Sequence, residues 1–225
     1  MLYSKSAVAT QILLTSEGAS LLVDAGDGLL RDLTEAKFDF DGLKAVLITH
    51  EHFDHTGGLF SLLHFMRHFP RREDLLICVP KPVVYVQKLL EPPLMYSEMP
   101  FAVKIKETYE GDHFDMGPFH VEPFRTNHAD AQTLGFSVSD RIGFRVVISG
   151  DTSASQNLRS RVEGADLAVL ESTFEDGQEA FAERYGHMTA SQSRELGRLA
   201  KKAVYVHQMP QDYFVRMTCS EVSNS

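Results

Sequence analysis

Four residues with metal-binding side chains lie in one short segment of the chain: His50, His52, Asp54 and His55. Imidazole nitrogens and carboxylate oxygens are the usual protein ligands of zinc and of related catalytic metals. In an extended loop, alternate spacing lets His50 and His52 point the same way, and Asp54 and His55 then turn toward a second metal. Two glycines follow, and glycine allows close backbone approach at the turn into a helix. The segment therefore favours a metal site over a solvated polar loop.

Other candidate ligands share one feature, which is that each follows an apolar segment predicted to be a strand. These pairs are 43–49 before His50, 119–126 before His128, 144–149 before Asp151 and 203–206 before His207. Strands in a layered α/β fold bring their ends to a common edge, where the loops build the site. Segments far apart in the sequence are thus expected to converge on one cleft.

The elements that must position these residues alternate between strand and helix. Apolar runs and alternation predict strands at 7–14, 19–23, 43–49, 75–79, 119–126, 134–139, 144–149, 167–170 and 203–206. Helical spacing of apolar residues predicts helices at 29–36, 58–69, 83–90, 174–185 and 189–201. The last helix begins with Thr189-Ala190-Ser191-Gln192, a capping box.

Three sequence features occur together and in a fixed order. They are His50-x-His52-x-Asp54-His55-x-Gly57-Gly58, an upstream Asp24-x-Gly26, and a later Gly150-Asp151-Thr152. This combination resembles the metallo-β-lactamase superfamily over about residues 6–207. The resemblance implies an α/β fold, the four-layer αββα sandwich, in which two mixed sheets pack face to face, helices lie outside and the site lies at one edge.

The same resemblance implies a ligand set for two divalent metal ions, with zinc expected and manganese as the alternative. One ion takes His50, His52 and His128. The other takes Asp54, His55 and His207, and Asp151 bridges both. Asp24 is expected to orient a ligand histidine, as metal-bound imidazoles commonly require.

The region 165–189 narrows the resemblance to the ribonuclease Z branch and its phosphodiesterase relatives. In that branch a histidine before a helix, with a nearby glutamate, serves the leaving oxygen, and the matching positions are His187 and Glu171. The N-terminus of a helix attracts phosphate, which suits a histidine at that place. The alternative is that His187 only packs against its neighbours or caps the helix.

The predicted activity is hydrolysis of phosphodiester bonds by a water activated between two metals, with an RNA 3′ end or a smaller phosphodiester as substrate. The predicted catalytic residues are Asp54, which orients the water, His187, which protonates the leaving oxygen, and Glu171, which supports it. One alternative is a lactonase or thioesterase on the same fold. Another is a catalytically silent binding protein, against which the complete ligand set argues.

Three departures separate the chain from a full ribonuclease Z pattern. It begins past the family's glycine-rich first strand, and the stretch from His128 to Asp151 has no room for the long arm that many members insert for tRNA. The tail at 208–225 lacks the usual closing strand pattern, so the chain is expected to be shortened or divergent at both ends. These departures affect tRNA binding and leave the metal ligands intact.

Length and composition fit a single hydrolase domain over residues 1–225. The formal net charge of −9 is unusual for a protein that grips long nucleic acid non-specifically. Basic residues do gather locally, and solvated helix faces are the favoured interpretation of both groups: Arg67, Arg71 and Arg72, and Arg194, Arg198, Lys201 and Lys202.

The two cysteines, Cys78 and Cys219, are expected to be free thiols in a reducing compartment. The sequence contains no recognisable signal peptide and no apolar run long enough for a membrane span. A cytoplasmic protein without a membrane partner is therefore predicted. Relatives of the ribonuclease Z type are often dimers, so the resemblance also implies a homodimer.

Overall fold

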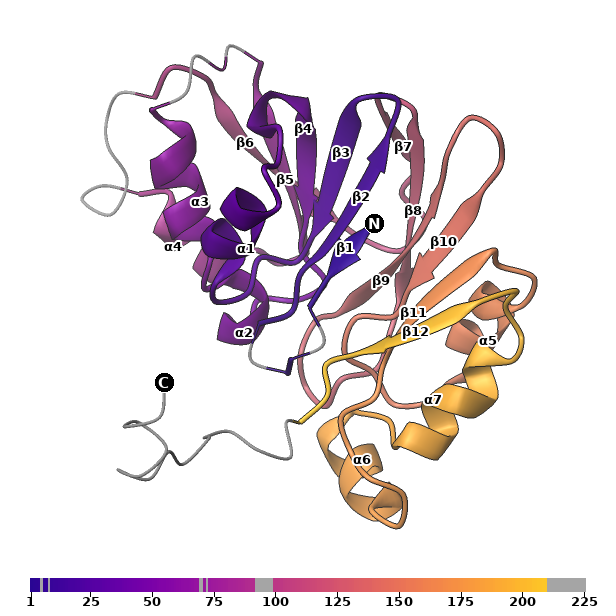
Figure 1. The fold of residues 1–225 in the computed structure, drawn as a ribbon. Coiled ribbons are helices and arrows are strands. Elements are labelled where there is room, and N and C mark those ends of the chain that lie inside the picture. The colour runs from indigo at the N-terminus through magenta and orange to yellow at the C-terminus, as the bar shows by residue number, and fades with distance from the viewer. Residues whose placement is uncertain (5, 8, 69–70, 72, 92–98, 210–225) are drawn as a thin grey trace, which may run out of the picture.

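The structure, a computed structural model, describes residues 1–4, 6–7, 9–68, 71, 73–91 and 99–209. Its strands form two sheets of six (Figure 1). The first sheet has the order β1 (Leu2–Tyr3), β2 (Ile12–Ser16), β3 (Ala19–Val23), β4 (Leu43–Leu47), β5 (Leu75–Pro80) and β6 (Val103–Thr108). The second has the order β12 (Ala203–Val206), β11 (Leu167–Glu171), β10 (Arg145–Ile148), β9 (Leu134–Ser139), β8 (Phe119–Arg125) and β7 (Phe114–Met116).

Both sheets are mixed, because antiparallel hairpins at one side continue into parallel strands at the other. In the first sheet β3 to β6 are parallel, and in the second β10 to β12 are parallel. Parallel strands require crossover connections, and the helices supply several of them. These are α1 (Leu29–Glu35), η1 (Phe40–Gly42), α2 (Phe53–Thr56), α3 (Leu59–Met66), α4 (Tyr85–Leu89), α5 (Gln156–Val162), α6 (Glu179–Tyr185) and α7 (Ala190–Gly197).

The alternation of side chains along each strand separates three apolar layers. Leu21 and Leu47 point between the sheets and meet Phe136 of the opposite sheet. Their neighbours point outward, so that β3 and β4 also pack against α1 and α3, while β10 and β11 pack against α5 and α7. Helices therefore cover the outer face of each sheet, and the predicted αββα sandwich is confirmed.

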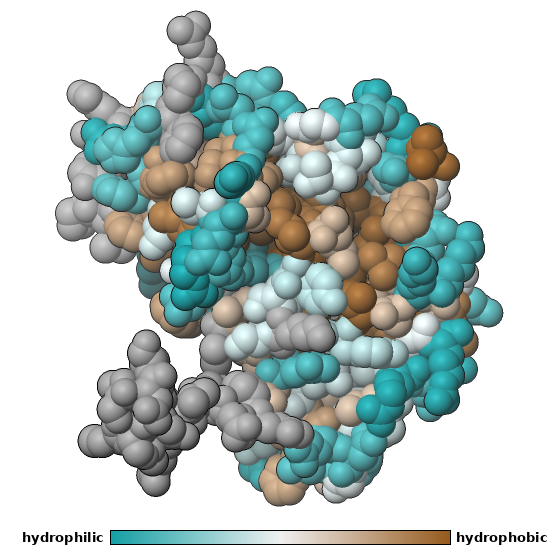
Figure 2. Space-filling view, viewed as in Figure 1, coloured by the Kyte–Doolittle hydropathy of each residue, from teal (hydrophilic) through white to brown (hydrophobic). Residues whose placement is uncertain are grey.

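Apolar side chains also reach the surface near the N-terminus. Figure 2 shows hydrophobic residues gathered there, over the strands that face the viewer, with hydrophilic residues around them. A depression in this region is lined by Met1, Leu14, Phe119, Val138 and Phe144, among others. No helix in the described part of the chain is long and apolar enough to cross a bilayer.

The first predicted hairpin exists, but the prediction of a strand over 7–11 was wrong. Strand β2 begins only at Ile12. The preceding backbone bonds elsewhere, because Thr10 N donates to Asp54 O and Ala7 N donates to Gln208 O. Gln11 O accepts from Ser4 N just after β1, so these residues are held by separate contacts with several segments and not by one continuous strand pairing.

The helix predicted over 174–185 is also shorter than expected, since α6 begins at Glu179. Phe174 instead pairs with the segment before α7: its N–H donates to Met188 O, and its carbonyl accepts from Ala190 N. This pairing fixes the segment that directly follows His187. The capping box at Thr189 is confirmed, with Gln192 as its reciprocal partner.

Candidate metal centre

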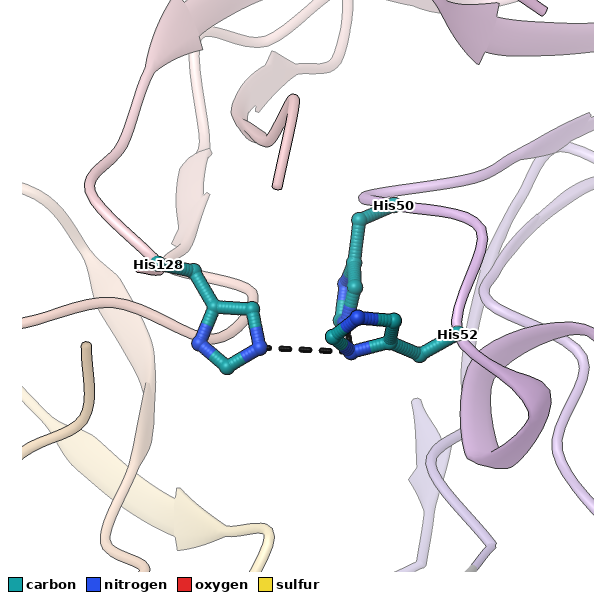
Figure 3. Close-up of side chains that lie close together, drawn as sticks. All are labelled: His50, His52 and His128. Carbon is teal, nitrogen blue, oxygen red and sulfur yellow. Dashed lines mark hydrogen bonds between the residues drawn. The ribbon is translucent and has the colours of Figure 1, made fainter. Parts of the chain in front are cut away.

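Three histidines from the two halves of the molecule form a first group of ligand atoms, all within 4.8 Å of one another. His50 and His52 come from the loop after β4, and His128 reaches them from the loop after β8 (Figure 3). His52 Nδ1 lies 2.9 Å from His50 Nε2 and 3.3 Å from His128 Nε2. Burial holds the pKa of His50 well below its usual range, helped by the neighbouring histidines and opposed by Asp151. The buried ring is thereby kept in the neutral form that binds metals.

A second group contains two carboxylates and two histidines, again with ligand atoms within 4.8 Å: Asp54, His55, Asp151 and His207. His207 Nε2 lies 3.1 Å from Asp54 Oδ2 and 3.2 Å from Asp151 Oδ2. Asp151 Oδ2 is also 3.3 Å from His55 Nε2 and 3.9 Å from His50 Nε2. Asp151 therefore lies between the two groups.

These residues fit a pair of divalent cations, and the clearest sign is two buried polar atoms without hydrogen bonds. They are His55 Nε2 and Asp151 Oδ1. A buried, unpaired polar atom typically costs about 1–3 kcal/mol, and a bound cation would remove that cost. Burial lowers the pKa of His55, but Asp151 and Asp24 outweigh burial and raise it well above its usual value. The carboxylates thus favour positive charge at this point.

A fully buried carboxylate sets the orientation of His55. Asp24 follows β3 with a backbone φ of 60°, a conformation that is uncommon outside glycine. Its Oδ2 accepts a hydrogen bond of 2.7 Å from His55 Nδ1, and its Oδ1 accepts one of 2.7 Å from Thr49 N. Because Nδ1 is occupied, Nε2 of His55 faces Asp151. Asp24 thus orients a candidate ligand histidine, as predicted from the sequence.

Other histidines are held in the same way. His128 Nδ1 donates to Gly186 O at 2.9 Å, and His207 Nδ1 lies 2.9 Å from Thr173 Oγ1. The contact at Gly186 requires glycine, since a Cβ there would lie 2.2 Å from the backbone nitrogen of Ala129 and φ is +69°. The rings of these candidate ligands are thus oriented by contacts within the protein.

His187 and Glu171 form a hydrogen-bonded pair beside these groups. His187 Nδ1 lies 2.8 Å from Glu171 Oε1, and the His187 ring contacts the rings of His128 and His207, with centroids 4.6 and 5.4 Å apart. Burial lowers the pKa of His187, but Glu171 outweighs burial and raises it. Ligand atoms of His128, Asp151 and His187 also lie within 4.8 Å of one another, so His187 touches the candidate centre itself.

Glu171 is in turn fixed by its surroundings. It ends β11, and its carboxylate accepts hydrogen bonds from the backbone N–H groups of Thr152, Thr173 and Met188 and from Thr173 Oγ1. Thr173 therefore joins Glu171 to His207. Thr173 was not predicted, because a hydroxyl that bridges two site residues follows no recognisable spacing in the sequence.

The structure thus brings together all seven predicted ligands and the predicted catalytic residues. Metal binding by these residues stays a prediction, as do their catalytic roles. For the basic residues, the prediction of solvated helix faces was wrong at Arg71. Arg71 is buried and donates to the carbonyls of Phe40, Asp41, Glu73 and Asp74, so it is a structural residue. Arg72 lies outside the described residues, and Arg194 pairs with Asp176 at 2.6 Å.

A comparison with protein families identifies the chain. A family model described as the beta-lactamase superfamily domain matches residues 20–207, which include every candidate ligand. The chain belongs to the beta-lactamase superfamily. The predicted resemblance is confirmed, and the match covers both sheets from β3 to β12.

Relatives within this superfamily include proteins named Ribonuclease Z. One from Bradyrhizobium sp. (strain ORS 278) is 26% identical, over 82% of this chain and 78% of the relative. Among solved structures, human tRNase Z, short form, has a TM-score of 0.80 at 24% identity and covers 93% of this chain and 92% of its own. The metallo-beta-lactamase fold protein YhfI from Bacillus subtilis has a TM-score of 0.77 at 22% identity, over 96% of this chain and 84% of its own. The two structures support the fold.

Proposed function

We propose that this protein is a ribonuclease Z-like metallo-hydrolase that cleaves phosphodiester bonds with two bound divalent ions, of which zinc is the first candidate. The observation that carries the proposal is the position of the His187–Glu171 pair beside two ligand groups that meet at Asp151. The relatives named Ribonuclease Z support the same class of reaction. A centre of this kind combines a place for metals with a separate proton donor.

The residues divide into holders of the ions and groups that handle protons. His50, His52 and His128 would hold one ion, Asp54, His55 and His207 the other, and Asp151 both. Such ions lower the pKa of a bound water and neutralise developing charge on phosphate oxygens. The side chain of Asp54 is 29% exposed, while that of Asp151 is 3% exposed. Asp54 is thus the carboxylate of the pair that solvent reaches, which suits it to orienting the attacking water.

His187 would act as the general acid. Its Nδ1 is bound to Glu171, which leaves Nε2 for the leaving oxygen of the substrate. Proton donation of this kind typically contributes about 10²- to 10⁴-fold to the rate. Burial lowers the pKa of His187, but Glu171 outweighs burial and raises it, which favours the protonated ring that a general acid needs.

The proposed substrate class is a phosphodiester, either an RNA 3′ end or a smaller molecule. Between His128 and Asp151 the chain holds β9, β10 and their connections, so no inserted arm lies at this position. Such an arm is where the resemblance places tRNA binding. We therefore propose the type of reaction and not a tRNA substrate. The homodimer and the cytoplasmic location stay predictions.

The test is hydrolysis of bis(p-nitrophenyl) phosphate by protein loaded with zinc or manganese. The wild-type protein should turn it over. His187→Ala should lower kcat about 10²- to 10⁴-fold on a dinucleoside phosphate, whose alkoxide leaving group needs a proton, and less on bis(p-nitrophenyl) phosphate, while metal content stays the same. A lactone and a thioester are assayed in parallel, because those reactions do not require a His187-type proton donor. Turnover of the lactone or thioester only, unchanged in His187→Ala, would refute the phosphodiesterase proposal.

A further inference from the structure

A cavity of about 490 Å³ opens beside the first group of histidines, and His52 and His128 form part of its wall. A substrate phosphate held at these residues would therefore have its attached organic group at the mouth of this cavity. Another part of its wall is formed by the segment after β5, including Pro82, Val84 and Tyr85. The cavity thus extends the candidate site from the histidines to the segment after β5.

The charge of the cavity determines what it accepts. Among the described residues that line it, the carboxylates are Glu51 and Asp130, and none is lysine or arginine. Glu51 is bound to backbone N–H groups, so a second phosphate entering this space would meet the carboxylate of Asp130 and no lysine or arginine among these residues. The cavity therefore favours an uncharged group over a continuing sugar-phosphate backbone.

Tyr85 supplies a flat surface at the edge of this space. The residue is 62% exposed, and it is one of the residues that line the cavity. Lys88 Nζ lies 5.9 Å from the centre of its ring, so a cation approaches the ring from its own helix. Exposed aromatic rings of this kind are the usual platforms on which planar groups stack.

Glu51 fixes this wall to the candidate metal centre. It lies between His50 and His52 in the sequence, and its carboxylate accepts backbone N–H bonds from three consecutive residues of the wall. The distances are 3.0 Å from Val84, 2.8 Å from Tyr85 and 2.7 Å from Val86. One side chain of the metal loop thus sets the position of Tyr85 relative to the ligands on either side of it.

We propose that this cavity is a subsite for an uncharged planar group attached to the bound phosphate, with Tyr85 as its stacking surface and Glu51 as a positioning residue. The inference rests on the proposed phosphodiesterase function. A nucleobase and another aromatic ring offer the same chemistry to Tyr85. The substrate class is narrowed to phosphate esters that carry such a ring.

The test measures binding, so that it does not depend on turnover. Zinc-loaded protein is titrated calorimetrically with phenyl phosphate and with methyl phosphate, which differ in the ring alone. The wild-type protein should bind phenyl phosphate on the order of tenfold more tightly, and Tyr85→Ser should remove most of that preference. Tyr109→Ser is the matched control, because Tyr109 is 57% exposed but does not line the cavity.

The outcomes separate the two proposals. Equal binding of both esters by the wild-type protein would overturn the subsite and leave the phosphate site standing. Binding of neither ester would count against the proposed function itself. Uridine monophosphate and ribose 5-phosphate form a second pair: a preference for the nucleotide supports a nucleobase in the subsite, and a preference confined to phenyl phosphate supports another aromatic ester.

Two further variants test Glu51. In Glu51→Ala the preference for phenyl phosphate should fall several-fold, because the wall loses three hydrogen bonds. Glu51→Gln should restore part of it, since the amide oxygen still accepts N–H bonds. Metal content should match the wild-type value in both variants. Loss of metal with the preference retained, or full preference in Glu51→Ala, would show that Glu51 does not position the wall.

Discussion

Two clusters of histidine and carboxylate side chains differ in their surroundings, although both have ligand atoms within 4.8 Å. One is the buried centre around Asp151. The other lies on the surface of the hairpin β7–β8 and contains His113, His120 and Glu122. In the surface cluster His120 has two carboxylate neighbours, Asp115 at 2.8 Å and Glu122 at 3.4 Å. Its charges are therefore balanced by the protein.

The buried centre also pairs histidine with carboxylates, since His55 lies 2.7 Å from Asp24 and 3.3 Å from Asp151, but it leaves two polar atoms without hydrogen bonds. His55 Nε2 and Asp151 Oδ1 are buried without hydrogen bonds, while Glu122 of the surface cluster also pairs with Arg161 at 3.3 Å. Burial makes each unpaired atom costly, whereas exposed atoms can bond to water. Proximity of ligand atoms thus does not distinguish a metal site. Two clustered ligand atoms that are buried without a hydrogen bond favour a metal at the centre around Asp151.

The largest difference is expected when each cluster loses a central residue. Asp151→Ala should release metal and lower the rate of phosphodiester hydrolysis about 10³-fold or more, because metal ions supply several kcal/mol of transition-state stabilisation. His120→Ala should leave metal content and rate unchanged. Metal analysis of the purified proteins and steady-state kinetics measure both. Metal lost from His120→Ala would reverse the contrast between the clusters.

A matched pair of carboxylates tests orientation, since Asp24 and Asp115 each bind Nδ1 of a histidine. Asp24→Asn should weaken metal binding about 10- to 100-fold, the usual cost of losing a residue that orients a ligand histidine. Asp115→Asn should leave metal affinity unchanged. Competition with a chromophoric chelator gives the affinities. Equal affinities in Asp24→Asn and the wild-type protein would contradict the role of Asp24.

Most residues of the candidate centre could be predicted from the sequence, because they occupy fixed positions in the order of motifs and strands. Four candidate ligands follow strands, and parallel strands end at a shared edge, so their convergence could be predicted from the order of elements alone. Asp24 was also predicted. By contrast, β6 and β7 were missed, since β6 alternates lysines with apolar residues at the edge of its sheet and β7 has only three residues.

The contacts between loops could not be predicted from the sequence. Glu51 accepts from backbone N–H groups of Val84 to Val86, more than thirty positions away, and backbone donors leave no mark in a sequence. Helix α5 was missed as well, although Ser155 caps it by accepting from Leu158 N. Its few apolar positions are too short a pattern to show helical periodicity. Such details appear only once the sheets have placed the loops.

A smaller effect concerns the pH dependence of turnover. Glu171 raises the pKa of His187, and the general acid must be protonated to act. kcat should therefore fall as pH rises through the pKa of His187. In Glu171→Gln the carboxylate that raises the pKa of His187 is gone, so the pKa should fall. The falling limb of the kcat profile should then move to lower pH. Rate profiles of the two proteins, with folding checked by circular dichroism, measure the shift. An unmoved limb would show that another group sets it.

The smallest effect is expected in the surface cluster. The hydrogen bond with Asp115 has the largest influence on the pKa of His120 and raises it, while burial opposes the shift. A histidine whose pKa is raised in the folded state stabilises the fold below its unfolded pKa, and this contribution disappears as pH rises through the folded value. Asp115→Asn should therefore lower the pKa of His120 in an NMR titration, with little change in thermal stability because the pair is exposed. The same histidine should titrate freely in metal-loaded protein, since a bound ion would suppress its titration. A His120 that stops titrating when zinc is added would place a metal in the surface cluster and remove the distinction drawn from burial.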